Sequence, residues 1–151
     1  MRRFALYAFV ITLLWLGFVC AISFVEAPLK FKAPGVELKH ALSIGRLVFH
    51  ALNRVELICC AFSWFLMLRL RVVRTRGSVV LLAIITAVLA FQVWGLMPAL
   101  DVRAKAVLAG EIVAASWHHN AYIGLEFLKA ALLGVLAAAQ IQSFARAVLS
   151  E

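Results

Sequence analysis

Hydrophobic residues along this chain gather into four long runs that short polar stretches separate. The runs cover approximately residues 4–25, 44–68, 78–97 and 118–141. A helix of about 20 apolar residues is long enough to cross the hydrocarbon core of a bilayer. Because little sequence remains outside the runs, we expect a single transmembrane domain over residues 1–151 and no soluble module. The pattern predicts an all-α fold, an integral membrane four-helix bundle.

Composition supports a bilayer as the environment of these helices. The chain is 66% hydrophobic and 15% charged, whereas a soluble domain is about half apolar and a quarter charged. The formal net charge of +8 would raise nucleic acid as a partner of a soluble protein. Here the arginines concentrate where a predicted span meets water, which favours contact with anionic lipid. We therefore predict the lipid bilayer as a partner and no nucleic acid.

The strongest topology signal is a short basic loop after the second run. It contains Arg69, Arg71, Arg74 and Arg76. Loops rich in arginine and lysine face the cytoplasm. Arg2 and Arg3 at the start of the chain and Arg146 near its end fall on the same side. We therefore predict a multi-pass protein of the cell inner membrane with both termini cytoplasmic.

Prolines and glycines predict where the helices end. Pro28 is expected to break the first helix soon after Glu26, and Pro34-Gly35 predicts a turn. Pro98 and Asp101 are expected to close the third span. The residues that follow, 101–115, place small apolar side chains on one face and predict a short helix on the outer surface.

The first half of the second span carries an unusual set of polar side chains. At about 100° per residue, an arc of roughly 160° holds Arg46, Phe49, His50, Asn53, Arg54 and Glu56. An ionisable group inside a bilayer costs on the order of 2.5–3.5 kcal/mol, so these groups must face protein or water.

The fourth span carries a matching stripe. His118, His119, Tyr122, Glu126 and Lys129 lie within a narrow sector of its helical wheel. The first and third spans have few polar residues, which would suit contact with a partner protein. The candidate site is therefore predicted between the second and fourth helices.

Helix geometry places the two stripes at matching depth. At 1.5 Å per residue, Arg54 and Glu56 lie about 15–18 Å below the outer surface, and Glu126 and Lys129 about 10–15 Å below it. The simplest scheme pairs Arg54 with Glu126 and Glu56 with Lys129, although these partners could exchange. His50, His119, Tyr122 and Glu26 would then line an outer mouth. The predicted binding or ion-pair cluster is Glu26, Arg46, His50, Asn53, Arg54, Glu56, His119, Tyr122, Glu126 and Lys129.

Several functions fit such a cluster. The first is a pocket, open to the outer side, that binds or translocates a small solute, an ion or a proton. The pairs could instead only fix which helix faces which. A second function is that of an accessory or structural subunit of a larger membrane complex, or of a homo-oligomer. A third is a b-type haem site at His50 and His119, or a copper or zinc site, although both histidines lie close to the surface.

Catalysis receives little support. Ser23, Ser63 and Ser78 have no nearby histidine and acid at a suitable spacing, and there is no glycine-rich phosphate loop. The cysteines are Cys20, Cys59 and Cys60, which show neither a CxxC motif nor a Cys/His spacing for zinc. We predict no resident cofactor and favour a role other than that of an enzyme.

A set of residues in the first half of the chain resembles a known family. They are Trp15-Leu-Gly17, the segment Ser23-Phe-Val-Glu-Ala27-Pro28-Leu-Lys-Phe31, and Gly45-Arg46-Leu-Val-Phe49. This pattern is similar to that of the transmembrane protein 205-like family of small four-helix membrane proteins. The resemblance implies the four-span fold and places Ala27, Pro28 and Phe31 at the family's loop motif. Some members of that family are associated with drug or metal resistance, which would favour export or cation handling.

Overall fold

The computed structural model describes the chain except residues 1, 72, 112, 114–115 and 150–151. Four long helical segments account for nearly all of it. They are α1 (Arg2–Val19) continuing through η1 (Cys20–Glu26), α2 (Ala27–Leu29) and η2 (Lys30–Lys32); α3 (Leu38–Arg69); α4 (Arg76–Ala90) continuing through η3 (Phe91–Leu96) and α5 (Met97–Leu108); and α6 (Trp117–Leu149). Each segment is long and apolar enough to cross a membrane, which confirms the predicted all-α arrangement.

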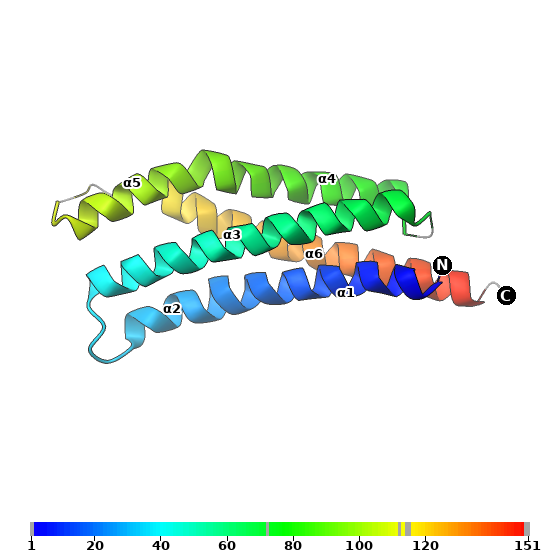
Figure 1. Ribbon diagram of the computed structural model, residues 1–151, viewed down its shortest axis with the longest axis horizontal. Helices are drawn as coiled ribbons and strands as arrows, with labels where there is room; N and C mark the ends of the chain where they lie inside the picture. The colour runs from blue at the N-terminus through cyan, green and yellow to red at the C-terminus, as the bar shows by residue number, and fades with distance from the viewer. Residues whose placement is uncertain (1, 72, 112, 114–115, 150–151) are drawn as a thin grey trace.

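The four segments form an elongated bundle (Figure 1). Helix α1 packs along α3 and α6, and α4 packs along the same two helices, so α3 and α6 lie diagonally across the bundle. Both termini lie at one end, which we call the proximal end, and α2 and α5 lie at the other, distal end (Figure 1). The second and fourth predicted spans therefore do not pack along each other, and long side chains join them across the centre of the bundle.

Neither proline ends its helix, contrary to the sequence prediction. Pro28 and Pro98 each follow a π-helical turn, η1 and η3, and the chain continues as helix beyond both. A proline in a regular α-helix clashes with the carbonyl four residues earlier and leaves it unpaired. A π turn carries hydrogen bonds that span five residues instead, as from Ala27 N–H to the Ile22 carbonyl. The wider turn admits the proline without ending the helix.

The same continuity corrects the prediction for residues 101–115. Their helical part belongs to α5, which extends the third span to Leu108 instead of forming a separate surface helix, and residues 112 and 114–115 lie outside the described ones. Gly110 ends the segment with φ +86°, and Gly35 occupies the predicted Pro34-Gly35 turn with φ +77°. Only glycine adopts such backbone angles readily.

The apolar core fills the middle and proximal part of the bundle. Trp15, Cys60, Leu82, Ile85 and Leu133 belong to one buried cluster to which α1, α3, α4 and α6 all contribute. Directly on its distal side the interior becomes polar. Glu56 lies one helical turn before Cys60 in α3, and Lys129 lies one turn before Leu133 in α6, so both are on the distal side of the cluster. The candidate site begins at this boundary.

Candidate functional site

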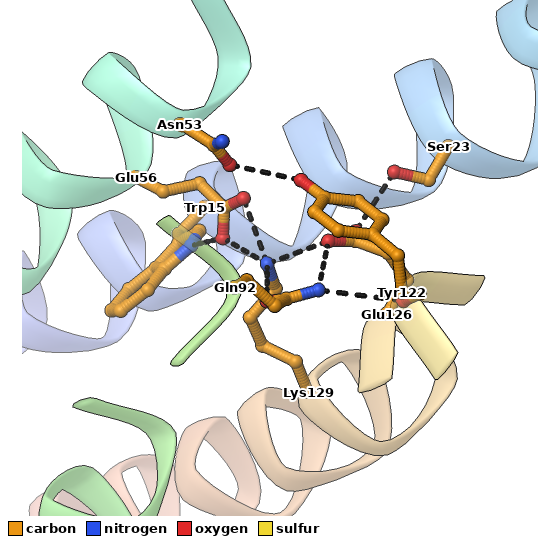
Figure 2. A network of polar contacts seen from close by, with 8 residues as sticks. All are labelled: Trp15, Ser23, Asn53, Glu56, Gln92, Tyr122, Glu126 and Lys129. Atoms are coloured by element: carbon orange, nitrogen blue, oxygen red, sulfur yellow. Dashed lines mark hydrogen bonds and ion pairs between the residues drawn. The ribbon is translucent and has the colours of Figure 1, made fainter. Parts of the chain in front are cut away.

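Lys129 lies at the centre of a buried polar network (Figure 2). Its side chain is fully buried, and its Nζ donates to Glu56, to Glu126 Oε1 and to Gln92 Oε1 at 2.7–2.8 Å. An ammonium group has three N–H bonds to donate. With three protein partners, Lys129 therefore needs no water.

Glu56 approaches Lys129 from the opposite side of the bundle. Its carboxylate is also fully buried and accepts from Lys129 Nζ at 2.7 Å and from the indole Nε1 of Trp15 at 2.8 Å. The predicted pair of Glu56 with Lys129 is therefore confirmed. Trp15 joins α1 to this pair, so the first span takes part in the site.

Glu126, one turn before Lys129, is the second buried carboxylate. Its Oε1 accepts from Lys129 Nζ and from Gln92 Nε2, both at 2.8 Å. Its other oxygen, Oε2, lies 2.8 Å from the hydroxyl of Ser23 (Figure 2). The two oxygens of Glu126 thus have different kinds of partner.

The π turns supply two of these partners. Ser23 lies in η1 and Gln92 in η3, and both point to Glu126 from different helices (Figure 2). A π turn inserts an extra residue into the helix and so changes which side chains face inward. The turns that accommodate Pro28 and Pro98 are thereby the turns that complete the network.

Tyr122 closes the network on the distal side. Its hydroxyl donates to Asn53 Oδ1 at 3.0 Å, and both side chains are buried. Its ring packs edge to face against Phe49 with centroids 5.6 Å apart. This bridge holds α6 to α3 just above the carboxylates.

The network carries an unbalanced charge if both acids are ionised. Two buried carboxylates, Glu56 and Glu126, surround one ammonium, that of Lys129. A net charge in a dry interior is far more costly than a bound proton, so such groups take up a proton instead. We infer that one of the two carboxylates holds a proton.

Hydrogen-bond chemistry identifies the oxygen that can hold this proton. Lysine, indole and amide N–H groups only donate, and they occupy both oxygens of Glu56 and Oε1 of Glu126. Ser23 is different because a hydroxyl can accept as well as donate. A proton on Glu126 Oε2 can be donated to Ser23 without breaking any other bond in the network.

A pocket of about 940 Å³ opens at the distal end above these groups. Both Ser23 and Glu126 belong to its lining, as does Tyr122. Its walls are mostly apolar and include Phe24, which stacks on Phe127 with centroids 4.4 Å apart. Glu126, whose Oε2 can carry the proton, therefore belongs to the lining of a pocket with aromatic walls.

Charged groups at the rim of the pocket are paired with one another. Arg46 Nε donates to Asp101 Oδ1 at 2.7 Å, and His50 Nε2 lies 2.8 Å from Oδ2 of the same carboxylate. Lys30 Nζ lies 3.2 Å from Glu26 and 5.3 Å from the centroid of the Phe49 ring. Asp101, absent from the predicted cluster, thus joins α5 to α3 at the mouth.

Arg54 does not take part, which corrects the predicted pair with Glu126. Its side chain is exposed on the outer surface of the bundle and forms no hydrogen bond or ion pair with the residues that the structure describes. Arg54 and Glu56 lie at opposite edges of the predicted arc, about 160° apart, so only one of them can face the interior. Lys129 takes the place that Arg54 was expected to fill.

The two histidines proposed as haem ligands are differently placed. His50 is bonded to Asp101, and His119 is exposed at the pocket rim. Ligation by His50 Nε2 would require its bond to Asp101 to break. Over the described ranges, no group of three or more His, Cys, Asp or Glu side chains could hold a metal ion.

Sequence reasoning missed Trp15, Ser23, Gln92 and Asp101. Gln92 and Ser23 were visible as polar residues in otherwise apolar spans, which is a signal of a buried partner in a membrane. Their direction was not visible, because regular helix geometry does not allow for the π turns.

Comparison with protein-family models, with curated proteins and with solved structures found no match to this chain. The resemblance to the transmembrane protein 205-like family therefore stays a prediction based on residues 15–49. The function has to be inferred from the geometry of the site.

Proposed function

We propose that this protein is a multi-pass inner-membrane protein that binds a small hydrophobic cation in its distal pocket and releases a proton from Glu126 in exchange. In this placement both termini and the basic loop between α3 and α4 face the cytoplasm, and the pocket opens to the outer side. The four apolar helices and the arginines at the proximal end support it.

One observation carries the proposal: Glu126 belongs both to the charge-unbalanced network and to the floor of the pocket. A proton held on Oε2 between Glu126 and Ser23 is thus next to the space that a ligand would fill. Loss of this proton leaves a negative charge that a bound cation can balance. Ligand and proton then compete for one carboxylate.

The pocket walls favour a cation with an apolar body. Phe24, Phe49, Tyr122 and Phe127 surround the space with aromatic rings, whose faces attract cations. Lys30 already places its ammonium 5.3 Å from the Phe49 ring centroid. The rim charges of Arg46 and Lys30 are neutralised by Asp101 and Glu26, and Arg103, which also lines the pocket, has an interaction partner as well. The carboxylate of Glu126 therefore favours a cationic ligand.

The exchange balances in atoms and charge. The cation enters the pocket, the O–H bond of Glu126 breaks, and the proton leaves through the distal opening to water. Ser23 turns its hydroxyl so that it donates to the new carboxylate. Lys129, Gln92, Trp15 and Glu56 keep their hydrogen bonds, so the remaining network need not rearrange.

Binding of tetraphenylphosphonium to the protein in lipid nanodiscs tests the proposal. Calorimetry in buffers of different ionisation enthalpy should show about one proton released for each cation bound. Because the cation prefers the deprotonated form, its affinity should rise with pH, by at most about tenfold per pH unit. Glu126→Gln should abolish both proton release and the pH dependence.

Two controls make the result specific. Glu111→Gln changes an exposed carboxylate outside the pocket. This variant should bind tetraphenylphosphonium and release a proton as the wild type does. The neutral probe triphenylphosphine oxide should release no proton. Cation binding without proton release, or unchanged pH dependence in Glu126→Gln, would refute the exchange at this carboxylate.

A further inference from the structure

The outer surface of α3 carries an apolar stripe with a single charge in it. The stripe, which we call the α3 outer stripe, consists of Leu47, Ala51, Arg54, Ile58, Ala61 and Phe65. All of these residues are exposed, and Leu47 and Ile58 are 67% and 68% exposed. They alternate by four and three residues, which is the spacing at which one helix packs along another.

Arg54 lies far from both ends of its helix. At 1.5 Å per residue it is about 15 Å from Ile44 and about 22 Å from Arg69. In the membrane placement proposed above, on which this inference rests, the guanidinium would face hydrocarbon. It has no ion-pair or hydrogen-bond partner among the described residues, and a charge at such a depth requires one.

The carboxylates of this chain are not available to Arg54. Glu56 and Glu126 are buried in the network around Lys129. The others that the structure describes lie toward the distal end: Glu26, Glu37, Asp101 and Glu111. Within the spans, Glu26 is paired with Lys30 and Asp101 with Arg46. Glu151 lies outside the described residues. The missing negative charge therefore has to come from another molecule.

A second copy of the chain does not supply it. Two copies in one membrane related by a two-fold axis through this stripe would bring their Arg54 side chains together, and like charges repel. A contact between different faces would need an exposed acidic residue without a partner, and the acids within the described spans are either buried or already paired. Charge complementarity points to a different protein.

We propose that the α3 outer stripe binds a transmembrane helix of another membrane protein that carries an aspartate or glutamate at the depth of Arg54. Ala51 and Ala61 flank the charge with small side chains, which allow two helices to approach closely. The partner helix should present apolar residues at the same alternation of four and three on either side of its acid. Such a partner makes this protein a subunit of a larger membrane assembly, in addition to any ligand that it binds.

Synthetic transmembrane helices provide the probe. The full-length protein, carrying a fluorescent donor, is placed in phosphatidylcholine liposomes with acceptor-labelled leucine-alanine helices that contain a central Glu, Gln or Leu. Energy transfer should show the Glu helix binding roughly 5- to 30-fold more tightly than the Gln helix, as expected for one interhelical polar pair. Arg54→Leu should remove this preference, and Arg54→Lys should retain it.

One further variant distinguishes binding at the α3 outer stripe from attraction by charge alone. Arg54→Leu combined with Ile84→Arg moves the charge to an exposed position of α4, and it should not restore the preference for the Glu helix. Lipid phosphate is the competing partner of Arg54. Equal binding of the three helices by the wild type would show that the guanidinium reaches the headgroups instead, and it would overturn the proposal. Wild-type thermal stability of Arg54→Leu establishes that the variant folds.

Discussion

At the scale of single residues, Lys129 determines the stability of the polar centre. Each of its N–H bonds is used by Glu56, Glu126 or Gln92, and none of these groups has another cation nearby in the network. Removal of one member of a buried ion pair leaves the other uncompensated, which typically costs about 3–5 kcal/mol. We therefore expect substitution of one charged residue of the network to destabilise the protein strongly, and neutralisation of both partners of an ion pair to destabilise it less.

A double-mutant cycle on Glu56 and Lys129 measures this coupling. Lys129→Met should lower the free energy of unfolding in detergent by about 3–5 kcal/mol, because the buried Glu56 carboxylate then loses the cation that pairs with it. The double variant Glu56→Gln/Lys129→Met should recover at least about 1 kcal/mol relative to additive losses. Arg54→Gln with Glu126→Gln provides the matched control and should be additive within about 0.5 kcal/mol. Additive losses for Glu56 and Lys129 would contradict their coupling.

Ser63 offers a second prediction at this scale, because its hydroxyl is buried without a hydrogen-bond partner among the described residues. An unsatisfied buried polar group costs roughly 1–3 kcal/mol. Ser63→Ala should therefore leave stability unchanged or raise it by about 1 kcal/mol in thermal or denaturant unfolding. Ser78→Ala, which removes a hydroxyl bonded to Thr75, should lower it instead. A loss in Ser63→Ala comparable to that in Ser78→Ala would reveal an unseen partner.

The sequence indicated most of the residues at this centre but not how they pair. Asn53, Glu56, Tyr122, Glu126 and Lys129 were expected at the site and are found in the network. The error concerned Arg54, since an arc of 160° is wider than the strip that one helix buries in a four-helix bundle. A helical wheel shows which residues share a face, but it does not show which part of a wide face points inward.

At the scale of elements, close packing between η2 and α3 shapes the pocket. A Cβ added at Gly45 would lie 2.7 Å from Lys30 Nζ, whereas one added at Gly134 would meet nothing within 4 Å. Both glycines lie inside helices, where alanine is favoured by up to about 1 kcal/mol. The two sites should therefore respond differently to the same substitution.

Gly134→Ala should raise stability by about 0.5–1 kcal/mol and leave tetraphenylphosphonium binding unchanged. Gly45→Ala should gain less, because the flexible end of Lys30 must move, and it should change cation affinity because Lys30 lines the pocket. Thermal unfolding and calorimetry report the two effects separately. Equal behaviour of both variants would mean that Lys30 does not occupy the space above Gly45.

The predicted helix ends at Pro28 and Pro98 were wrong for a reason that lies in the helices themselves. Sequence periodicity located the four long helices, and Gly35 marked its turn. Pro28 and Pro98 were expected to end helices because a regular α-helix cannot accommodate them. The π turns before them have no recognisable sequence signature, and so the orientations of Ser23 and Gln92 could not be predicted.

At the scale of the whole molecule, the arrangement of the bundle makes a topology test simple. Single cysteines replacing the exposed Ala33 and Ala109 mark the distal turns, and one replacing Arg74 marks the proximal loop. In cells, a membrane-impermeant thiol reagent added outside should label the distal cysteines, and it should label Arg74→Cys only after permeabilisation. Labelling of Arg74→Cys in intact cells would reverse the proposed orientation of the pocket.

The most direct measurement of the central claim is infrared difference spectroscopy of the protein with and without tetraphenylphosphonium. A proton on Glu126 Oε2 predicts a carbonyl stretch of a protonated carboxylic acid that disappears when the cation binds. Ser23→Ala should shift this band to higher frequency, because the proton loses its acceptor, whereas Trp15→Phe should leave it in place. Absence of the band in the unliganded protein, or a band that responds to Trp15→Phe and not to Ser23→Ala, would contradict a proton at the floor of the pocket.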